Sequence, residues 1–297
     1  MRGFNDDGKE RIKLTTVNSD SKGHQDHAEI AMAPDGRFVV VWEDQSASEK
    51  PQVFVRGFKA DGTESFKQFN VSGEPKGTRK SPDVAMASDG SFVVTWADDG
   101  DDNGGYQVHA RAFNANGTAK GNAFTVNSVG AHQQINPSIG MNAKGTYFIA
   151  YEDNSDESTA TSVYAIKVRG YSKDNKQIFA DQAIHKDKMT QKSPTVCVDK
   201  NDQAVVGWFG TSTRTKDKEP FSSPDLQRKT ITLEDGKYKV SAVGNVTAIG
   251  YTQTSDNNKN KMPDVACADS GRHVFVWSER LDLGKASEIY GRGFNGI

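Results

Sequence analysis

An aromatic residue and a carboxylate recur two positions apart along the sequence. The pairs are Trp42 with Asp44, Trp96 with Asp98, Tyr151 with Asp153, and Trp277 with Glu279, whereas a fifth aromatic, Trp208, is followed by Gly210. Residues i and i+2 of a strand lie on one face of a sheet, so each ring would stand beside its carboxylate. A sugar offers an apolar ring face and hydroxyl groups to such a pair. The spacing therefore predicts several similar carbohydrate sites with weak, multivalent binding. In the alternative, the aromatic packs between structural units and the acid caps a loop.

One acidic loop has the ligand types of a calcium site. The segment Asp99-Gly-Asp101-Asp-Asn103-Gly104 matches the D-x-D-x-N-G half of a calcium-binding loop. In such loops alternate oxygen ligands surround a hard cation, and glycine allows the sharp bend. The distant glutamate that completes an EF-hand is missing, because Ala110 stands at its position. The loop predicts a calcium cofactor bound by Asp99, Asp101 and Asn103, and the alternative is a solvated acidic turn.

A different set of acids would suit glycoside hydrolysis. Three acids and two hydroxyl residues share one repeat position: Glu29, Asp83, Ser138, Thr195 and Asp264. Asp199 is a further candidate nearby. A glycosidase needs one carboxyl group with a raised pKa and an ionised carboxylate roughly 5 to 9.5 Å away. Catalysis requires an asymmetric site, whereas the sequence is regular. The regularity favours a non-enzymatic binding module over a glycoside hydrolase or a structural protein–protein interaction repeat.

These candidate residues belong to an internal repeat. The segment 82–96, PDVAMASDGSFVVTW, recurs at 28–42, 137–151, 194–208 and 263–277, and the closing aromatics lie 54, 55, 57 and 69 residues apart. Two strand-like runs follow each hairpin, as in VFVRGF, an Asp61-Gly62 turn, and FNVS. No stretch repeats apolar residues at a helical period. Each copy is therefore predicted to be a four-stranded antiparallel unit.

Five such units predict an all-β fold, a five-bladed β-propeller with four-stranded antiparallel blades. We expect a single domain over residues 1–297. Its inner strands are expected near residues 28–33, 82–87, 137–142, 194–199 and 263–268. Within these strands the fourth position is small in every copy and the fifth is apolar, as expected where five strands converge near an axis.

The two ends of the sequence repeat the same third strand. Arg-Gly-Phe-Asn occurs at 2–5 and again at 292–295, and an outer strand is expected near 14–18. We therefore expect pairing of the N- and C-terminal strands to close the ring. The surplus copy predicts either a frayed end, as in a piece of a longer secreted protein, or a strand exchanged in a homo-oligomer.

The two cysteines occupy inner-strand positions that are small or apolar in the other copies. Cys197 is at the fourth position and Cys267 at the fifth, so we expect their side chains to point to opposite faces of their blades. This predicts free, buried thiols. A disulfide between neighbouring blades is the alternative.

The blade pattern, roughly PDVAMAxDGxFVVxW, an acidic loop, VxxRGFxxDG and FxVN, resembles a propeller repeat of large secreted and surface-attached bacterial proteins. The resemblance covers nearly the whole chain and is weak between residues 210 and 262. It implies a secreted or cell-surface location and an adhesive or carbohydrate-contacting role. In architecture alone the chain is similar to tachylectin-type five-bladed lectins, whose characteristic motifs are absent.

Composition excludes other classes of partner. The 297 residues carry 37 basic and 39 acidic side chains, a net charge of −2, which offers no electrostatic basis for binding nucleic acid. No apolar run approaches the roughly 18 residues of a spanning helix, so no membrane insertion is expected. The predicted partners are glycans or surface glycoconjugates, and the predicted state is a monomer or a strand-exchanged homo-oligomer.

Overall fold

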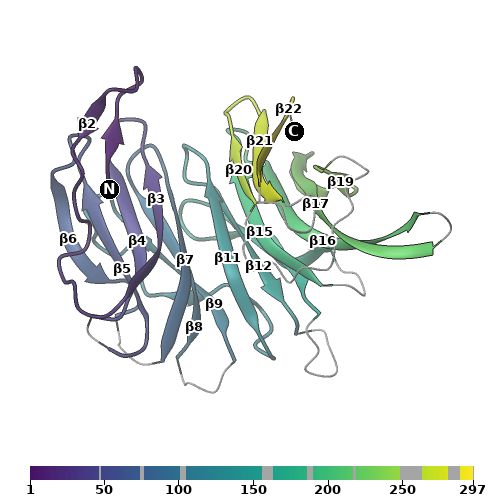
Figure 1. The fold of residues 1–297 in the computed structure, drawn as a ribbon, viewed down its shortest axis with the longest axis horizontal. Helices are drawn as coiled ribbons and strands as arrows, with labels where there is room; N and C mark the ends of the chain where they lie inside the picture. Colours follow the sequence, from purple (N-terminus) through teal and green to yellow (C-terminus); the bar gives the residue numbers. More distant parts are fainter. Residues whose placement is uncertain are drawn as a thin grey trace.

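The computed structural model describes residues 1–46, 48–73, 77–100, 105–155, 163–185, 190–216, 219–247, 263–279 and 288–296, with the side chains of 211–224 left aside. Within these ranges the backbone forms strands β1 to β22 and no helix, and none of these residues forms a membrane-crossing helix. The strands build five antiparallel blades, which confirms the predicted five-bladed β-propeller (Figure 1).

The blades follow one another along the chain. Blade 1 contains β3 (Gln25–Met32), β4 (Phe38–Asp44), β5 (Gln52–Phe58) and β6 (Glu64–Asn70), and blade 2 contains β7 (Thr78–Met86), β8 (Phe92–Asp99), β9 (Gln107–Phe113) and β10 (Phe124–Thr125). Blade 3 contains β11 (Gln134–Met141), β12 (Tyr147–Asp153), β13 (Ala165–Tyr171) and β14 (Gln177–His185). Blade 4 contains β15 (Gln191–Val198), β16 (Ala204–Lys216), β17 (Glu219–Glu234), β18 (Lys237–Val240) and β19 (Gly244–Asn245). Blade 5 contains β20 (Asp264–Cys267), β21 (His273–Glu279) and β22 (Glu288–Phe294).

The apolar core lies between adjacent blades. Alternate residues of each strand face opposite ways, so every blade has one face toward the next blade and one toward the preceding blade. Val39 and Val41 of blade 1, for example, form one buried cluster with Phe92 and Trp96 of blade 2. The core is therefore a series of nearest-neighbour interfaces, as in other repeat proteins.

A cation on each third strand connects its blade to the preceding one. Arginine Nη1 donates to a backbone oxygen of the preceding outer strand: Arg56 to Val17 (2.6 Å), Arg111 to Val71 (2.9 Å), Arg169 to Val126 (2.6 Å) and Arg292 to Val246 (2.7 Å). In blade 4, Lys229 makes the equivalent bond to Ile184. The contact of Arg56 identifies the segment around Val17 as the outer strand that precedes blade 1.

The prediction of free thiols is wrong, because Cys197 and Cys267 form a disulfide. The bond joins the inner strands β15 and β20 of neighbouring blades. Fourth-position residues face the next blade: a Cβ built on Gly140 would lie 2.5 Å from the backbone oxygen of Val196. Fifth-position residues face the preceding blade. Side chains of opposite phase on adjacent blades therefore meet, which is the reverse of the conclusion drawn from the sequence.

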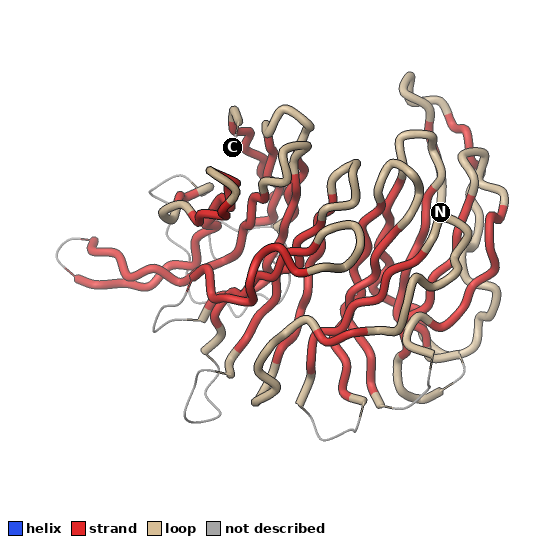
Figure 2. The backbone as a smooth tube through the Cα atoms, turned by 180° about the vertical axis from the view of Figure 1, so that it is seen from behind, coloured by secondary structure: helices blue, strands red, loops and turns tan. Residues whose placement is uncertain are grey.

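The expected pairing of the terminal strands is not observed among the described residues. β1 (Gly3–Phe4) pairs with β2 (Glu10–Ile12), and β22 pairs with β21 alone. Figure 1 shows the N-terminal strands beside blade 1 and β22 beside β21, and both views show the two ends of the chain well apart (Figures 1 and 2). The reason is the duplicated third strand: the N-terminal outer strand already has a partner in β1.

The insertion in blade 4 is a long hairpin. The backbones of β16 and β17 pair continuously from Ala204 with Ile231 to Lys216 with Glu219. Figure 1 shows this hairpin extending away from the blades.

Candidate functional site

Three carboxylates share one repeat position of the inner strands, where neighbouring blades approach one another. Asp83 Oδ2 accepts the backbone N–H of Ile139 on β11 at 2.8 Å, and its Oδ1 accepts the N–H of Val84 at 2.7 Å. Asp264 Oδ1 lies 3.4 Å from the hydroxyl of Thr195 on β15. Glu29, on β3, belongs to the same repeat position and is exposed.

Two electrostatic interactions connect the three carboxylates. Partial burial of the carboxyl group raises the pKa of Glu29 most, although the residue as a whole is exposed, and the charge of Asp264 raises it further. Burial likewise raises the pKa of Asp83 most, and the charge of Glu29 adds to that effect. Blades 5, 1 and 2 thus contribute to one acidic cluster. Blades 3 and 4 contribute Ser138 and Thr195 at the same position, so the cluster is asymmetric around the ring.

Asp83 has the most strongly shifted titration of the cluster. Burial raises the pKa of this carboxyl to about 7, although the N–H of Ile139 lowers it in part. A carboxyl group that is partly protonated near neutral pH can act as a general acid. The chain therefore holds a carboxyl group with a raised pKa near a second carboxylate, the two kinds of group that glycoside hydrolysis uses.

A second polar layer lies at the start of the inner strands. His27, Ser81, Asn136 and Ser193 have left-handed backbones, with φ between 50° and 52°, at the register shift of the inner strands of blades 1 to 4. A left-handed residue before proline, as at Ser81, Asn136 and Ser193, is unusual and must be held by its surroundings.

Two glutamates hold these bends. Glu43 accepts the backbone N–H of Ser81 at 2.7 Å and lies 3.3 Å from Nδ1 of His27. Glu152 accepts the N–H of Ser193 at 2.8 Å and the amide of Asn136 at 2.9 Å. Burial raises the pKa of Glu152, but its hydrogen bonds and its 1% exposure make it a positioning group. Sequence reasoning did not predict this positioning role for either glutamate; the only signal for it was the place of each glutamate directly after the repeated aromatic.

The predicted aromatic pairs lie inside the protein. Trp42, Trp96, Tyr151 and Trp277 are buried, as are Asp44, Asp98 and Asp153. The indole N–H of Trp42 donates to Asp44 at 2.7 Å, and that of Trp96 donates to Asp98 at 2.8 Å. These rings offer no accessible face to a sugar; they pack between blades and hold the carboxylate at the strand end. For Glu279 the structure describes the backbone only, which pairs with Glu288.

In the two copies with Trp208 and Tyr151, the aromatic side chain has a different hydrogen-bond partner. Trp208 donates to Gln191 at 2.9 Å, since Gly210 stands where the acid would be. The hydroxyl of Tyr151 reaches Asp181, and Asp153 is instead neutralised by Lys167 at 3.0 Å. Trp208 thus keeps an acceptor for its indole N–H, whereas Asp153 keeps an ion pair at Oδ1 and has no hydrogen-bond partner at its buried Oδ2.

The predicted calcium loop lies largely outside the described residues. Asp101 and Asn103 are not described, and Asp99 is a buried residue at the end of β8. Among the residues that are described, no group of three or more His, Cys, Asp or Glu side chains is arranged to hold a metal ion.

Asp199, the further carboxylate candidate, caps a turn, where it accepts the N–H groups of Asn201 (2.8 Å) and Gln203 (3.0 Å).

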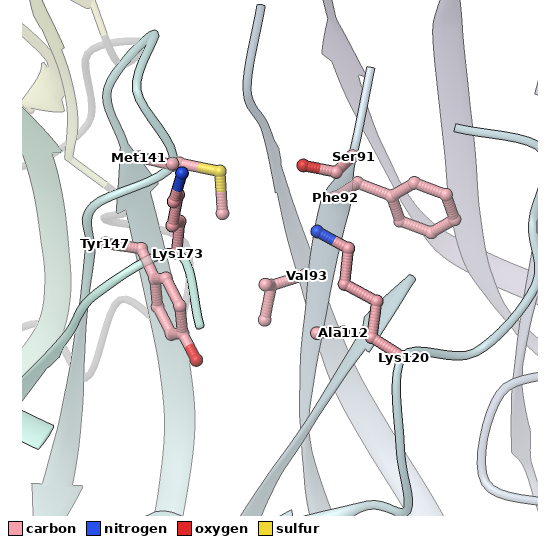
Figure 3. A pocket seen from close by; sticks show the side chains of 9 residues that line it. Ser91, Phe92, Val93, Ala112, Lys120, Met141, Tyr147 and Lys173 are labelled. Atoms are coloured by element: carbon pink, nitrogen blue, oxygen red, sulfur yellow. The ribbon is translucent and has the colours of Figure 1, made fainter. Parts of the chain in front are cut away.

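A small pocket opens between blades 2 and 3, and no acidic residue lines it. Ser91, Lys120 and Lys173 are among the residues that line it, together with Tyr147 (Figure 3). Its small size and exposed lysines provide no built recognition site.

Comparison with known proteins relates the fold to sugar-cleaving enzymes. No protein-family model matches the sequence, and no curated protein sequence is significantly similar to it. Among solved structures, a GH93 α-L-arabinofuranosidase of Fusarium graminearum in complex with arabinobiose is 11% identical, with a TM-score of 0.56 over 91% of this chain and 93% of its own. An α-L-arabinanase of Penicillium chrysogenum complexed with arabinobiose is 12% identical, with a TM-score of 0.55 over 88% of this chain and 79% of its own.

At this level of identity the similarity shows a shared fold. It nevertheless contradicts the prediction of a non-enzymatic binding module, because the similar five-bladed structures are glycoside hydrolases.

Proposed function

We propose that the protein is a glycoside hydrolase whose catalytic carboxyl groups are Asp83 and Glu29. The observation that carries this proposal is the asymmetric acidic cluster, in which Asp83 titrates near neutral pH beside a second carboxylate. A multivalent binder would repeat its site in every blade, whereas this cluster draws on blades 5, 1 and 2.

The roles follow from the environment of each group. Asp83, whose pKa is raised to about 7, donates a proton to the leaving-group oxygen. Glu29, exposed on β3, is the second carboxylate, which acts on the anomeric carbon directly or through water. Asp264 contributes negative charge beside Glu29 and thereby tunes its titration.

Glycans containing α-L-arabinofuranose are the first substrates to test, since two proteins of similar fold act on arabinosides and bind arabinobiose. We expect the chain to hydrolyse an aryl α-L-arabinofuranoside, arabinobiose or arabinan. Asp83→Asn should abolish cleavage of arabinobiose but retain part of the cleavage of a nitrophenyl glycoside, whose leaving group needs no proton. Glu29→Gln should abolish both reactions.

Glu64→Gln is the matched control, because Glu64 is an acid of the outer strand β6 that pairs with Arg56. It should keep wild-type activity. Activity of the Asp83→Asn and Glu29→Gln variants equal to wild type on every glycoside would refute the assignment. Absence of hydrolysis across a broad glycan panel would refute the proposed function.

The disulfide supports a secreted or cell-surface location, because structural disulfides persist in oxidising compartments. Kinship with the bacterial surface repeat and calcium binding at Asp99, Asp101 and Asn103 stay predictions. Calcium would be tested by comparing thermal stability in calcium and in EDTA.

A further inference from the structure

The N-terminal strands are a half-blade that repeats the outer half of blade 1. Gly3 pairs with Ile12 and Phe4 with Glu10, as Gly57 pairs with Phe66 and Phe58 with Glu64. Arg2 contacts Glu10 at 2.8 Å, as Arg56 contacts Glu64. β1 therefore occupies a third-strand position and β2 a fourth-strand position, both next to blade 1.

Blade 5 has a third strand of its own, β22, with the same sequence. β22 pairs with β21 through seven residue positions, from Glu279 with Glu288 to His273 with Phe294. No fourth strand lies beside β22 among the described residues. The chain thus has two third strands and one fourth strand for a single blade position.

The face of blade 5 that would pack against blade 1 in a closed ring is exposed. Val274, Val276 and Ile289 of blade 5 are 49, 44 and 77% exposed, whereas the equivalent Val39, Val41 and Val53 of blade 1 are at most 2% exposed. These faces pack against the next blade in the rest of the ring.

The facing side of blade 1 shows the same anomaly. Ile30 of β3 is 56% exposed, while the equivalent Val84, Ile139, Val196 and Val265 are at most 7% exposed. Apolar side chains are therefore exposed both on blade 5 and on the side of blade 1 that faces it. This indicates an interface between blades 5 and 1 that is not formed in this structure.

A glycine in β22 gives an independent indication. The equivalent glycines of other third strands lie beneath a fourth-strand side chain: a Cβ on Gly3 would be 2.8 Å from Ile12, and one on Gly57 would be 2.1 Å from Phe66. A Cβ on Gly293 would meet nothing closer than Val274, at 3.7 Å. The missing side chain of Gly293 is required only if a fourth strand crosses it.

We propose that β22 and β1 are interchangeable occupants of one strand position, and that the ring closes in cis when β22 displaces β1 and pairs with the N-terminal outer strand, residues 10–18. The outer strand needs no movement, since Arg56 already holds Val17 where the other blades hold their outer strands. Closure buries Ile30, Val274 and Ile289 and joins Asp264 to Glu29 across a sealed seam.

Cysteine pairs distinguish the two arrangements. By analogy with Phe58 and Glu64, the closed ring places Phe294 opposite Glu10, whereas the present structure places Phe4 there. E10C/F294C should form an intramolecular disulfide on mild oxidation, identified by peptide mapping of the monomer. A cross-link in F4C/E10C alone, or an E10C/F294C cross-link found only between chains, would overturn the proposal.

Two glycine substitutions should shift the competition in opposite directions. In the E10C/F294C background, Gly3→Val should raise the cross-linked fraction, because its side chain clashes with Ile12 and weakens β1. Gly293→Val should lower it, because the valine side chain is tolerated only while no fourth strand pairs with β22. If the variants fail to fold, amide hydrogen exchange on the unmodified chain decides: β22 should be better protected than β1, and the reverse order would overturn the proposal. None of these readouts depends on enzymatic activity.

Discussion

The disulfide between Cys197 and Cys267 should stabilise the protein by closing a long loop. The two residues are 70 positions apart, and cross-linking a loop of that length lowers the entropy of the unfolded chain by an amount worth about 4 kcal/mol at 25 °C. The unfolding entropy of a 297-residue protein is about 0.6 kcal/mol per kelvin near its midpoint, so removal of the bond should lower Tm by about 7 °C.

The repeat itself supplies a substitution that removes the bond and little else. Alanine stands at the position of Cys197 in three other blades, and valine stands at the position of Cys267 in blade 4. Cys197→Ala with Cys267→Val therefore preserves the local packing. Calorimetry with and without a reducing agent should show that reduction lowers the Tm of the wild type to that of the double variant. An unchanged Tm in the double variant, or equal sensitivity of both proteins to reductant, would refute the reasoning.

Three other perturbations test the packing and the titration. Trp96→Phe removes the donor to Asp98 and should lower the unfolding free energy in urea by about 1 to 3 kcal/mol; an unchanged midpoint would show that the bond contributes nothing. Gly140→Ala places a Cβ 2.5 Å from a backbone oxygen of the neighbouring inner strand and should cost about 1 to 3 kcal/mol, whereas Gly121→Ala, with open space around it, should be neutral. Because the pKa of Asp83 is about 7 when folded and about 4 when unfolded, the folded state binds the extra proton, and stability should fall as pH rises between these values. Asp83→Asn should flatten this part of the urea-stability profile, and an identical profile in both proteins would contradict the assigned pKa.

The fold was predictable because its signal is repeated. The recurring hairpin fixed the number of blades, and the alternation of small and apolar residues located the inner strands. The disulfide was not predictable by the same logic. Cys197 and Cys267 point to opposite faces of their own blades, and only the packing of blade 4 against blade 5 shows that these two faces meet.

The sequence identified the acidic residues of the candidate site but not their environment. Glu29, Asp83 and Asp264 stood out as carboxylates at one repeat position, but their shared environment depends on how the ring curves. The aromatic pairs misled for the same reason: strand alternation places Trp96 beside Asp98 correctly, yet it does not say whether that face meets solvent or a neighbouring blade.

The cation contacts between blades have a consequence for the order of folding. The bonds made by Arg56, Arg111, Arg169 and Arg292 span 39 to 46 residues. The entropic cost of closing loops of these lengths differs by only about 0.1 kcal/mol. No interface is then favoured over another by chain connectivity, and each can form as soon as its second blade has left the ribosome. During synthesis the propeller should therefore grow one blade at a time from the N-terminus, with the first outer strand already in place on blade 1.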